Sequence, residues 1–284
     1  MAITGKTTVT GIIGWPVSHS LSPVLHNAAF QALDLDWIYV PFPVAPERLA
    51  EGIAGLKSLG VAGFSVTIPH KVAIIPLLDQ VTPEAELIGA VNTVVAREGR
   101  LFGYNTDGIG LIAALREKLG CDPEGKRVLV LGAGGAARSA VVSLAAAGAA
   151  GIAIANRSTD AAVALAHLVG ARLTATRCEG GGLASLADPG FMGSFDLVVN
   201  TTSVGMAGDS FAGLALSSLA PGACVYDMVY APPVTPLLAQ AGALGIPCAN
   251  GFGMLVAQGE AAFRIWTGAT PPRGCMEGAL AAVL

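Results

Sequence analysis

The chain has 284 residues, of which 53% are hydrophobic and 13% are charged, and its formal net charge is -4. This composition provides the core of one large domain or two ordinary ones and disfavours a disordered chain. The lysines and arginines are scattered, which disfavours a nucleic-acid-binding protein, because such a protein needs a basic patch.

The long uncharged run at 139–156 is rich in alanine and contains two glycines, so we predict a soluble helix followed by a buried strand instead of a membrane span. The first residues lack the pattern of a signal peptide. The five cysteines and four histidines are dispersed, so we predict no metal site and no disulfide framework. We therefore expect a cytoplasmic protein without a membrane or nucleic-acid partner, acting as a monomer or a homodimer.

Short apolar runs alternate with amphipathic stretches, which is typical of β/α units. In the first part of the chain we predict strands at Val9–Ile13, Trp37–Phe42, Phe64–Ile68, Thr93–Ala96 and Leu101–Gly103. Helices are expected between them at Pro23–Leu33, Glu47–Leu59 and Val72–Leu78, with Ser22 as an N-cap.

A second series of β/α units begins near Arg127. Strands are expected at 127–131, Ile152–Ala155, Leu197–Asn200, Cys224–Tyr226 and Pro247–Ala249, and helices at Ala136–Ala147, Thr159–Leu168, Thr235–Ala243, Met254–Trp266 and Cys275–Leu284. The glycine-rich stretch Arg177–Gly193 is predicted to be mostly loop. These series predict an α/β protein with two lobes, in which residues 1–106 and the C-terminal helices 255–284 form one domain and residues 107–254 the other.

The segment "VLVLGAGGAARSAVV" fits a G-x-G-x-x-G/A motif that follows a strand and opens a helix. Gly132 allows the tight turn, Gly134 lets a pyrophosphate approach the backbone, and Ala137 lets the helix pack closely on the strand. The amino end of the helix offers free N–H groups to phosphates. The whole loop therefore predicts a Rossmann-type dinucleotide site: Gly132, Ala133, Gly134, Gly135, Ala136 and Ala137.

The next strand ends in Asn156-Arg157-Ser158, and no acidic residue occurs between Gly132 and Thr159. NAD-binding sites usually carry an acid about 20 residues past the loop, where it meets the ribose 2′-hydroxyl. An arginine can pair with a 2′-phosphate and stack on the adenine. The sequence therefore predicts NADP over NAD.

The other polar residues lie in a series of short motifs, which are, in chain order, "GWPVSHSLSP", "SVTIPHK", "GAVNTV", "GYNTDG", "GAGGAARS", "ANRS", "NTTSVGM", "YDMVYAPPVTPLL" and "NGFGMLVAQGEAAFRIWTG". In these motifs and their order, the sequence resembles the shikimate dehydrogenase family over nearly the whole chain. The resemblance implies an α/β substrate lobe and a Rossmann-type NADP-binding lobe with a cleft between them. It also implies NADPH-dependent, reversible reduction of 3-dehydroshikimate to shikimate, a step toward chorismate and the aromatic amino acids.

By position in these motifs, the resemblance implies a role for each polar residue. Ser20 and Ser22 would bind the substrate carboxylate, with Tyr230 near that end; Thr67, Asn92 and Gln258 would hold ring hydroxyls; Lys71 and Asp107 would form the catalytic pair; Thr202, Met206 and Gly251 would lie on the cofactor side, the last two beside the nicotinamide. The sequence departs from the family at Ser65, where asparagine is common, and we expect a retained fold with altered substrate contacts.

Reduction of a ketone needs a hydride, which the cofactor supplies, and a proton, which the protein must supply. Lys71 is protonated at neutral pH and can donate in the reducing direction. A closed site would ease loss of that proton, whereas Asp107 would favour the ammonium form, and the sequence leaves this balance open. We expect Asp107 to orient Lys71 and to bind a substrate hydroxyl.

Two other functions stay open. One is a quinate/shikimate dehydrogenase with broader substrate or NAD use, although Ser22 and the missing acid favour shikimate and NADP. The other is a non-catalytic NADP-binding regulator, which the presence of both Lys71 and Asp107 disfavours.

Overall fold

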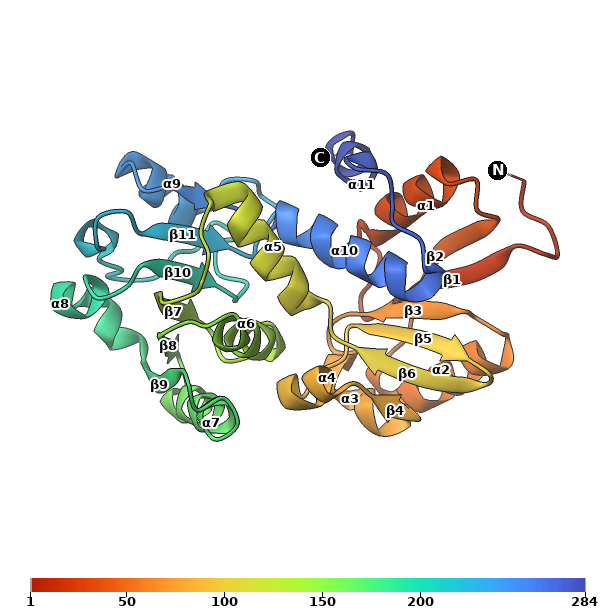
Figure 1. Cartoon of the computed structure of the whole chain (residues 1–284), viewed down its shortest axis with the longest axis horizontal. Coiled ribbons are helices and arrows are strands. Elements are labelled where there is room, and N and C mark those ends of the chain that lie inside the picture. Colours follow the sequence, from red (N-terminus) through yellow and green to blue (C-terminus); the bar gives the residue numbers. More distant parts are fainter. Residues whose placement is uncertain (1, 284) are drawn as a thin grey trace. The chain divides into compact units, whose positions relative to one another are not determined.

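The structure is a computed structural model and describes residues 2–283. The chain divides into two compact units, each built on a six-stranded sheet (Figure 1). The first unit runs up to Thr106 and resumes at Val256, and the second is Asp107–Leu255. No helix within residues 2–283 is long and apolar enough to cross a lipid bilayer.

The sheet of the first unit has the order β2-β1-β3-β5-β6-β4. Its strands are β1 (Thr8–Gly14), β2 (Trp37–Pro43), β3 (Gly63–Val66), β4 (Gln80–Val81), β5 (Thr93–Arg97) and β6 (Arg100–Tyr104). Strands β1, β2 and β3 are parallel to one another, while β5 is antiparallel to both β3 and β6. The carboxyl ends of β1, β3 and β6 and the amino end of β5 therefore lie at one edge of the sheet.

The helices of this unit are α1 (Ser22–Ala32), α2 (Leu49–Ser58), α3 (His70–Ala73), α4 (Pro83–Ile88), most of α10 (Phe252–Thr267) and α11 (Cys275–Ala281), with 3-10 turns at Pro46–Arg48 and Ile75–Leu77. Helix α1 packs on α11. The Trp266 indole of α10 donates to the Val94 carbonyl oxygen at 2.8 Å and lies where a side chain on Gly63 would stand. Glycine at position 63 thus lets α10 cross the sheet at β3 and β5.

The second unit has a fully parallel sheet in the order β12-β11-β10-β7-β8-β9, which is the order 6-5-4-1-2-3 within the unit and the order of a Rossmann fold. Its strands are β7 (Arg127–Leu131), β8 (Gly151–Asn156), β9 (Arg177–Gly182), β10 (Leu197–Asn200), β11 (Cys224–Asp227) and β12 (Cys248–Ala249). The chain reverses direction across the sheet between β7 and β10. Ligands of such sheets bind outside the carboxyl ends of the strands at this point.

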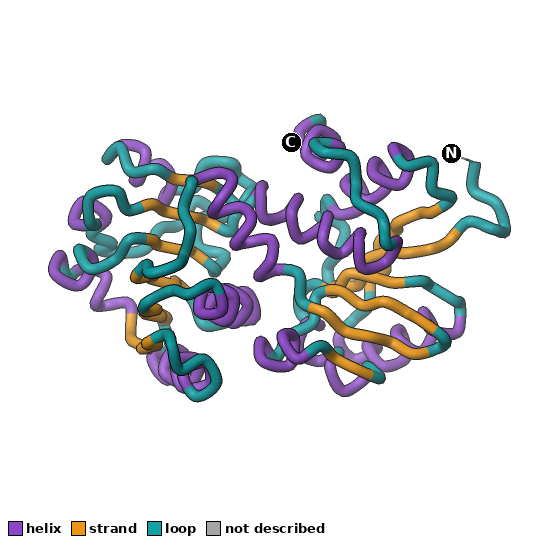
Figure 2. Tube along the Cα trace, viewed as in Figure 1, coloured by secondary structure: helices purple, strands orange, loops and turns teal. Residues whose placement is uncertain are grey.

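Helices cover both faces of this second sheet (Figures 1 and 2). They are α5 (Asp107–Leu119), α6 (Gly135–Ala146), α7 (Thr159–Gly170), α8 (Pro189–Met192) and α9 (Pro236–Ala243), with 3-10 turns at Leu183–Ala187 and Leu216–Ser218. Apolar residues of α8 and α9, including Met192 and Leu237, share one core with Leu129 and Val198 of the strands. This core fixes the sheet that presents the glycine loop.

Three predictions about local structure were wrong. The stretch 177–193 is ordered as β9, a 3-10 turn and α8, because glycine at 180 lets α7 pack directly on the strand: a Cβ there would overlap the Ala162 and Val163 backbone. Ser22 is the first residue of α1 and its side chain does not cap the helix; Leu21 is the cap residue. The helix expected at Val72–Leu78 is the short α3 followed by a 3-10 turn.

Candidate active site

The predicted substrate residues of the first unit gather at one edge of its sheet. Ser20 and Ser22 follow β1, Thr67 and Lys71 follow β3, and Asn92 precedes β5. The backbone N–H of Thr67 donates to the Ile13 carbonyl oxygen at 3.0 Å, so the end of β3 is fixed against β1. Three segments that are far apart in the sequence thus place hydroxyl, amide and ammonium groups along the same edge.

The two serines lie at the start of α1: Ser22 is its first residue, and Ser20 precedes the helix. The Ser22 N–H donates to the Ser20 hydroxyl oxygen at 3.3 Å, which satisfies one of the free donors at the helix start. Ser22 is buried and Ser20 is half-buried. The Ser20 hydroxyl thus bonds the first backbone N–H of α1 from two residues earlier in the chain, while Leu21 is the cap residue.

Lys71 lies in α3, and the backbone on both sides of it is anchored. Its carbonyl oxygen accepts from the Val91 N–H at 2.8 Å, and the ring Nε2 of the buried His70 contacts the Val44 carbonyl oxygen at 2.7 Å. The Cα position of a lysine on so short a helix would otherwise be poorly fixed. These bonds give the ammonium a defined starting point at the sheet edge.

Asn92 is buried, and its side chain holds the segment that leads to Asp107. Its Oδ1 accepts from the Thr106 N–H at 2.8 Å, and its Nδ2 donates to the Thr106 hydroxyl at 3.0 Å. Asn105, also buried, donates to the Ala90 carbonyl oxygen at 3.0 Å. Because Asp107 is the next residue and begins α5, these bonds set where its carboxylate starts.

Gln258 belongs to α10, two helical turns before Trp266. Positions 258, 262 and 266 share one face of the helix. Trp266 on that face is bonded to β5 and lies over Gly63, so Gln258 also comes from the sheet-facing side.

In the second unit the predicted cofactor residues gather at the carboxyl ends of the parallel strands. Gly132 follows β7 with φ +113°, a conformation that favours glycine, and α6 begins at Gly135. A Cβ added at Gly134 or Gly135 would meet no protein atom within 4 Å, so both glycines border open space that phosphates can fill. Ala137 is fully buried between helix and strand. The loop fits a dinucleotide pyrophosphate.

The end of β8 presents Arg157, which is exposed, between two residues with defined bonds. The Asn156 side chain donates to the Ser158 carbonyl oxygen at 3.1 Å, and the Ser158 hydroxyl caps α7 by accepting from the Ala161 N–H at 3.3 Å. The turn is thus rigid while the guanidinium is accessible. Asp160 is the first acidic residue after the loop, and it lies in the first turn of α7.

The remaining predicted site residues of the second unit, three for the cofactor and Tyr230 for the substrate, lie in loops after β10, β11 and β12. Thr202 donates its hydroxyl to the Asn200 side-chain oxygen at 2.7 Å, and Met206 is exposed. Tyr230 follows β11, and burial raises its pKa. The Gly251 N–H donates to the Val229 carbonyl oxygen at 3.1 Å. Sequence reasoning gave no role to Asn200, Asp227 or Thr235, although "NTTSVGM" and "YDMVYAPPVTPLL" contain them.

Gly251 leaves no space for a side chain, because a Cβ there would overlap the Met228 carbonyl oxygen. Replacing it with alanine is expected to lower the free energy of unfolding by about 1–3 kcal/mol, measured by urea denaturation. Gly242→Ala in α9 is the control, since a Cβ there meets nothing within 4 Å. Equal stabilities of the two variants would contradict the packing argument.

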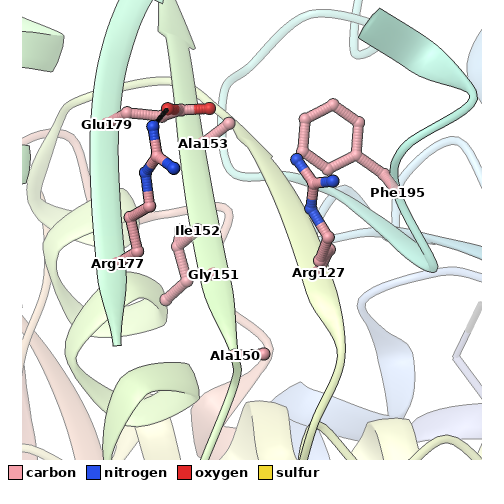
Figure 3. A pocket seen from close by; sticks show the side chains of 8 residues that line it. All are labelled: Arg127, Ala150, Gly151, Ile152, Ala153, Arg177, Glu179 and Phe195. Carbon is pink, nitrogen blue, oxygen red and sulfur yellow. Dashed lines mark hydrogen bonds and ion pairs between the residues drawn. The ribbon is translucent and has the colours of Figure 1, made fainter. Parts of the chain in front are cut away.

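A separate cavity of about 240 Å³ lies at the amino ends of β7, β8 and β9 (Figure 3). Its arginines already have partners: Arg177 pairs with Glu179 at 3.5 Å, and the Arg127 guanidinium lies over the Phe195 ring at 5.8 Å. The glycine loop is at the opposite edge of the sheet, so this cavity is not the dinucleotide site.

Comparison with known proteins agrees with this geometry. Residues 12–94 match the shikimate dehydrogenase substrate binding domain, residues 114–180 match shikimate / quinate 5-dehydrogenase, and residues 251–281 match the shikimate 5'-dehydrogenase C-terminal domain. A shikimate dehydrogenase (NADP(+)) of Citrifermentans bemidjiense is 74% identical over 100% of this chain and 98% of its own length. The chain belongs to the shikimate dehydrogenase family.

Two solved structures of the family show the range of its ligands. The shikimate dehydrogenase of Thermus thermophilus in complex with NADP(H) and shikimate is 36% identical, covers 98% of this chain and 100% of its own, and has a TM-score of 0.85. The quinate dehydrogenase of Corynebacterium glutamicum in complex with NAD is 30% identical, covers 97% and 99%, and has a TM-score of 0.89.

Membership in the shikimate dehydrogenase family confirms several predictions made from the sequence. The α/β fold with a Rossmann-type unit is confirmed, as are the enzyme class, an NADP-dependent oxidoreductase, and its reaction, the reversible reduction of 3-dehydroshikimate to shikimate. Among residues 2–283 no group of three or more histidine, cysteine or acidic side chains is placed to hold a metal ion. The roles of individual residues stay predictions.

Proposed function

We propose that the first unit binds the ring substrate and that the second unit binds NADP, with Lys71 and Asp107 as the catalytic pair. The observation that carries this assignment is the gathering of Ser20, Ser22, Thr67, Lys71 and Asn92 at one sheet edge. Neutral donors and acceptors around one ammonium suit a small polyhydroxylated acid. We further propose that the protein works in the cytoplasm.

Each group has a distinct task in this proposal. NADPH, when bound, supplies the hydride to the ketone carbon. Lys71 donates the proton to the oxygen of the same carbonyl, so that one hydride and one proton make the alcohol. Asp107 orients the ammonium and accepts from a substrate hydroxyl. Ser20 and Ser22 hold the carboxylate, and Thr67, Asn92 and Gln258 orient the ring.

The assay that tests this function follows NADPH oxidation with 3-dehydroshikimate. Initial rates are then compared for NADP against NAD and for shikimate against quinate in the reverse direction. We expect NADP and shikimate to be preferred. A higher kcat/KM with quinate, or equal use of NAD, would contradict the proposed specificity, and absence of NADPH oxidation would contradict the enzyme assignment.

Arg157→Glu is expected to reverse the charge that meets the 2′-phosphate. The carboxylate would repel the phosphate and could accept from a free ribose 2′-hydroxyl. We expect kcat/KM for NADP to fall at least tenfold, while the value for NAD is unchanged or rises. Arg172→Glu, beyond the end of α7, is the control. A preference that stays with NADP at the parent's ratio would refute the role of Arg157.

A further inference from the structure

A buried carboxylate ends β11 on the cofactor side of the second unit. Asp227 is fully buried. Its Oδ1 accepts from the Asn200 amide at 2.9 Å and from the Val229 N–H at 3.0 Å, and its Oδ2 accepts from the Thr235 hydroxyl at 2.6 Å. None of these donors is a cation. A buried charge is costly unless it is well bonded, so these neutral donors must hold the carboxylate.

Asn200 extends the network from Asp227 into the loop after β10. The two residues are opposite each other in register at the ends of adjacent strands. The Asn200 amide also donates to the Val204 carbonyl oxygen at 3.0 Å, and its Oδ1 accepts from the Thr202 N–H at 3.0 Å and hydroxyl at 2.7 Å. Both the amide nitrogen and the amide oxygen of Asn200 are bonded, so the orientation of the side chain is determined. These bonds also fix the loop 201–205 relative to Asn200.

The same loop forms a wall of the glycine turn. The Thr201 hydroxyl donates to the Leu131 carbonyl oxygen at 2.7 Å, directly before Gly132. A Cβ on Gly132 would lie 2.6 Å from that hydroxyl oxygen and 2.8 Å from the Thr202 methyl group. A shift of the loop after β10 would therefore change the space beside the turn that receives the pyrophosphate.

Thr235 connects Asp227 to α9 and packs against the loop that follows β10. Its hydroxyl caps α9 by accepting from the Leu238 N–H at 3.4 Å. A Cβ on Gly205 would lie 3.0 Å from the Thr235 Cβ. The loops 201–205 and 228–235 thus meet at a single carboxylate.

We propose that Asp227 is a positioning residue for the cofactor, because its carboxylate holds the loops after β10 and β11 in the arrangement that NADP binds. This inference rests on the proposed cofactor role of the second unit. Asp227 contacts neither substrate nor cofactor in this account and acts through Asn200 and Thr235. Its loss should weaken cofactor binding while leaving shikimate binding to the first unit unchanged.

Asp227→Asn tests the proposal with minimal change in shape. The asparagine Oδ1 can keep the two bonds from Asn200 and Val229. Its Nδ2 would face the Thr235 hydroxyl and can only donate, so the Thr235 O–H proton loses the acceptor that the carboxylate gives it. Thr235→Val removes the same bond from the other side. Thr235→Ser keeps the hydroxyl and is the matched control.

The dissociation constant of NADPH is measured by fluorescence and that of shikimate by calorimetry, with KM for both substrates and the thermal midpoint. We expect the NADPH constant to rise at least tenfold in Asp227→Asn and in Thr235→Val. The shikimate constant should stay within twofold, and Thr235→Ser should stay within threefold for NADPH. A purely structural role would not separate the two KM values.

Two results would overturn the positioning role: an NADPH constant within twofold of the parent in both variants, or a parallel weakening of NADPH and shikimate binding. If Asp227→Asn does not fold, Thr235→Val decides by the same criteria. The parent is measured first. Failure of the parent to bind NADPH would contradict the cofactor role itself, whereas unchanged binding by the variants contradicts only the positioning role.

Discussion

Replacing Lys71 with alanine is expected to lower kcat by a factor of about 10²–10⁴, the usual contribution of a positioned proton donor. The KM for 3-dehydroshikimate should change much less, because serine, threonine and asparagine side chains at the same sheet edge would still hold the ring. Steady-state kinetics at saturating NADPH would measure both values.

Because α3 is anchored by bonds outside the lysine side chain, this substitution should leave the backbone of the helix unchanged. Two hydrogen bonds anchor α3: the Val91 N–H donates to the Lys71 carbonyl oxygen, and the His70 ring contacts the Val44 carbonyl oxygen. Neither bond involves the lysine side chain. Alanine therefore retains the backbone of α3. Lys57→Ala is the matched control, because that lysine forms a half-exposed ion pair with Asp79 at 3.3 Å. The Asp79 carboxylate is bonded to Leu101 near the amino end of β6, at the edge of the sheet opposite Lys71.

A kcat for Lys71→Ala within about threefold of the parent would contradict the proton-donor role, because it falls well below the expected range. A comparable loss in Lys57→Ala would show that the assay responds to removal of any lysine. Shikimate calorimetry on both variants separates loss of chemistry from loss of binding.

The Rossmann unit was the part of the molecule most open to prediction. The glycine loop has local causes: Gly132 adopts a positive φ, and Ala137 packs at a close helix–strand contact. Such constraints act within a few residues and leave a direct mark on the sequence. The same holds for Arg157, whose meaning depends on its position after one strand.

Features that depend on distant partners were missed. Glycine has a low β propensity, so the glycines of β9 predict a loop instead of a strand. The strand needs glycine at position 180 because the backbone of α7 occupies the space where a side chain would stand. Asp227 and Asn200 acquire their role only when β10 and β11 are paired in register. Neither residue type at a strand end distinguishes a buried network from an ordinary turn.

His26 is another residue whose environment the sequence did not reveal. It is fully buried in α1, four residues after Ser22, and neither ring nitrogen has a hydrogen-bond partner within the described chain. The imidazole stacks on Tyr39 with ring centroids 4.5 Å apart and lies 5.0 Å from Trp266. Burial among these rings lowers the pKa of His26 from 6.5 to about 3.

This lowered pKa makes stability depend on pH in a defined direction. The folded protein keeps His26 neutral, whereas the unfolded chain takes up a proton below pH 6.5. Stability is therefore fully present above pH 6.5 and is lost as pH falls from 6.5 toward about 3, at about 1.4 kcal/mol per pH unit. Between pH 7.5 and pH 5 this one group should cost about 2 kcal/mol.

His26→Phe should remove this contribution, because phenylalanine keeps an aromatic ring in the stack and has no titrating nitrogen. Between pH 7.5 and pH 5, the free energy of unfolding of the variant should fall by about 2 kcal/mol less than that of the parent. Any cost of fitting the larger ring is the same at both pH values, so the difference isolates the titration. Urea denaturation at the two pH values measures it.

His167→Gln in α7 is the control for loss of a histidine from an exposed position. Acidic side chains titrate equally in all three proteins and cancel in the comparison. If His26→Phe and the parent lose the same free energy between pH 7.5 and pH 5, His26 is not held neutral. In that case burial of this ring makes no contribution to the pH dependence of the free energy of unfolding.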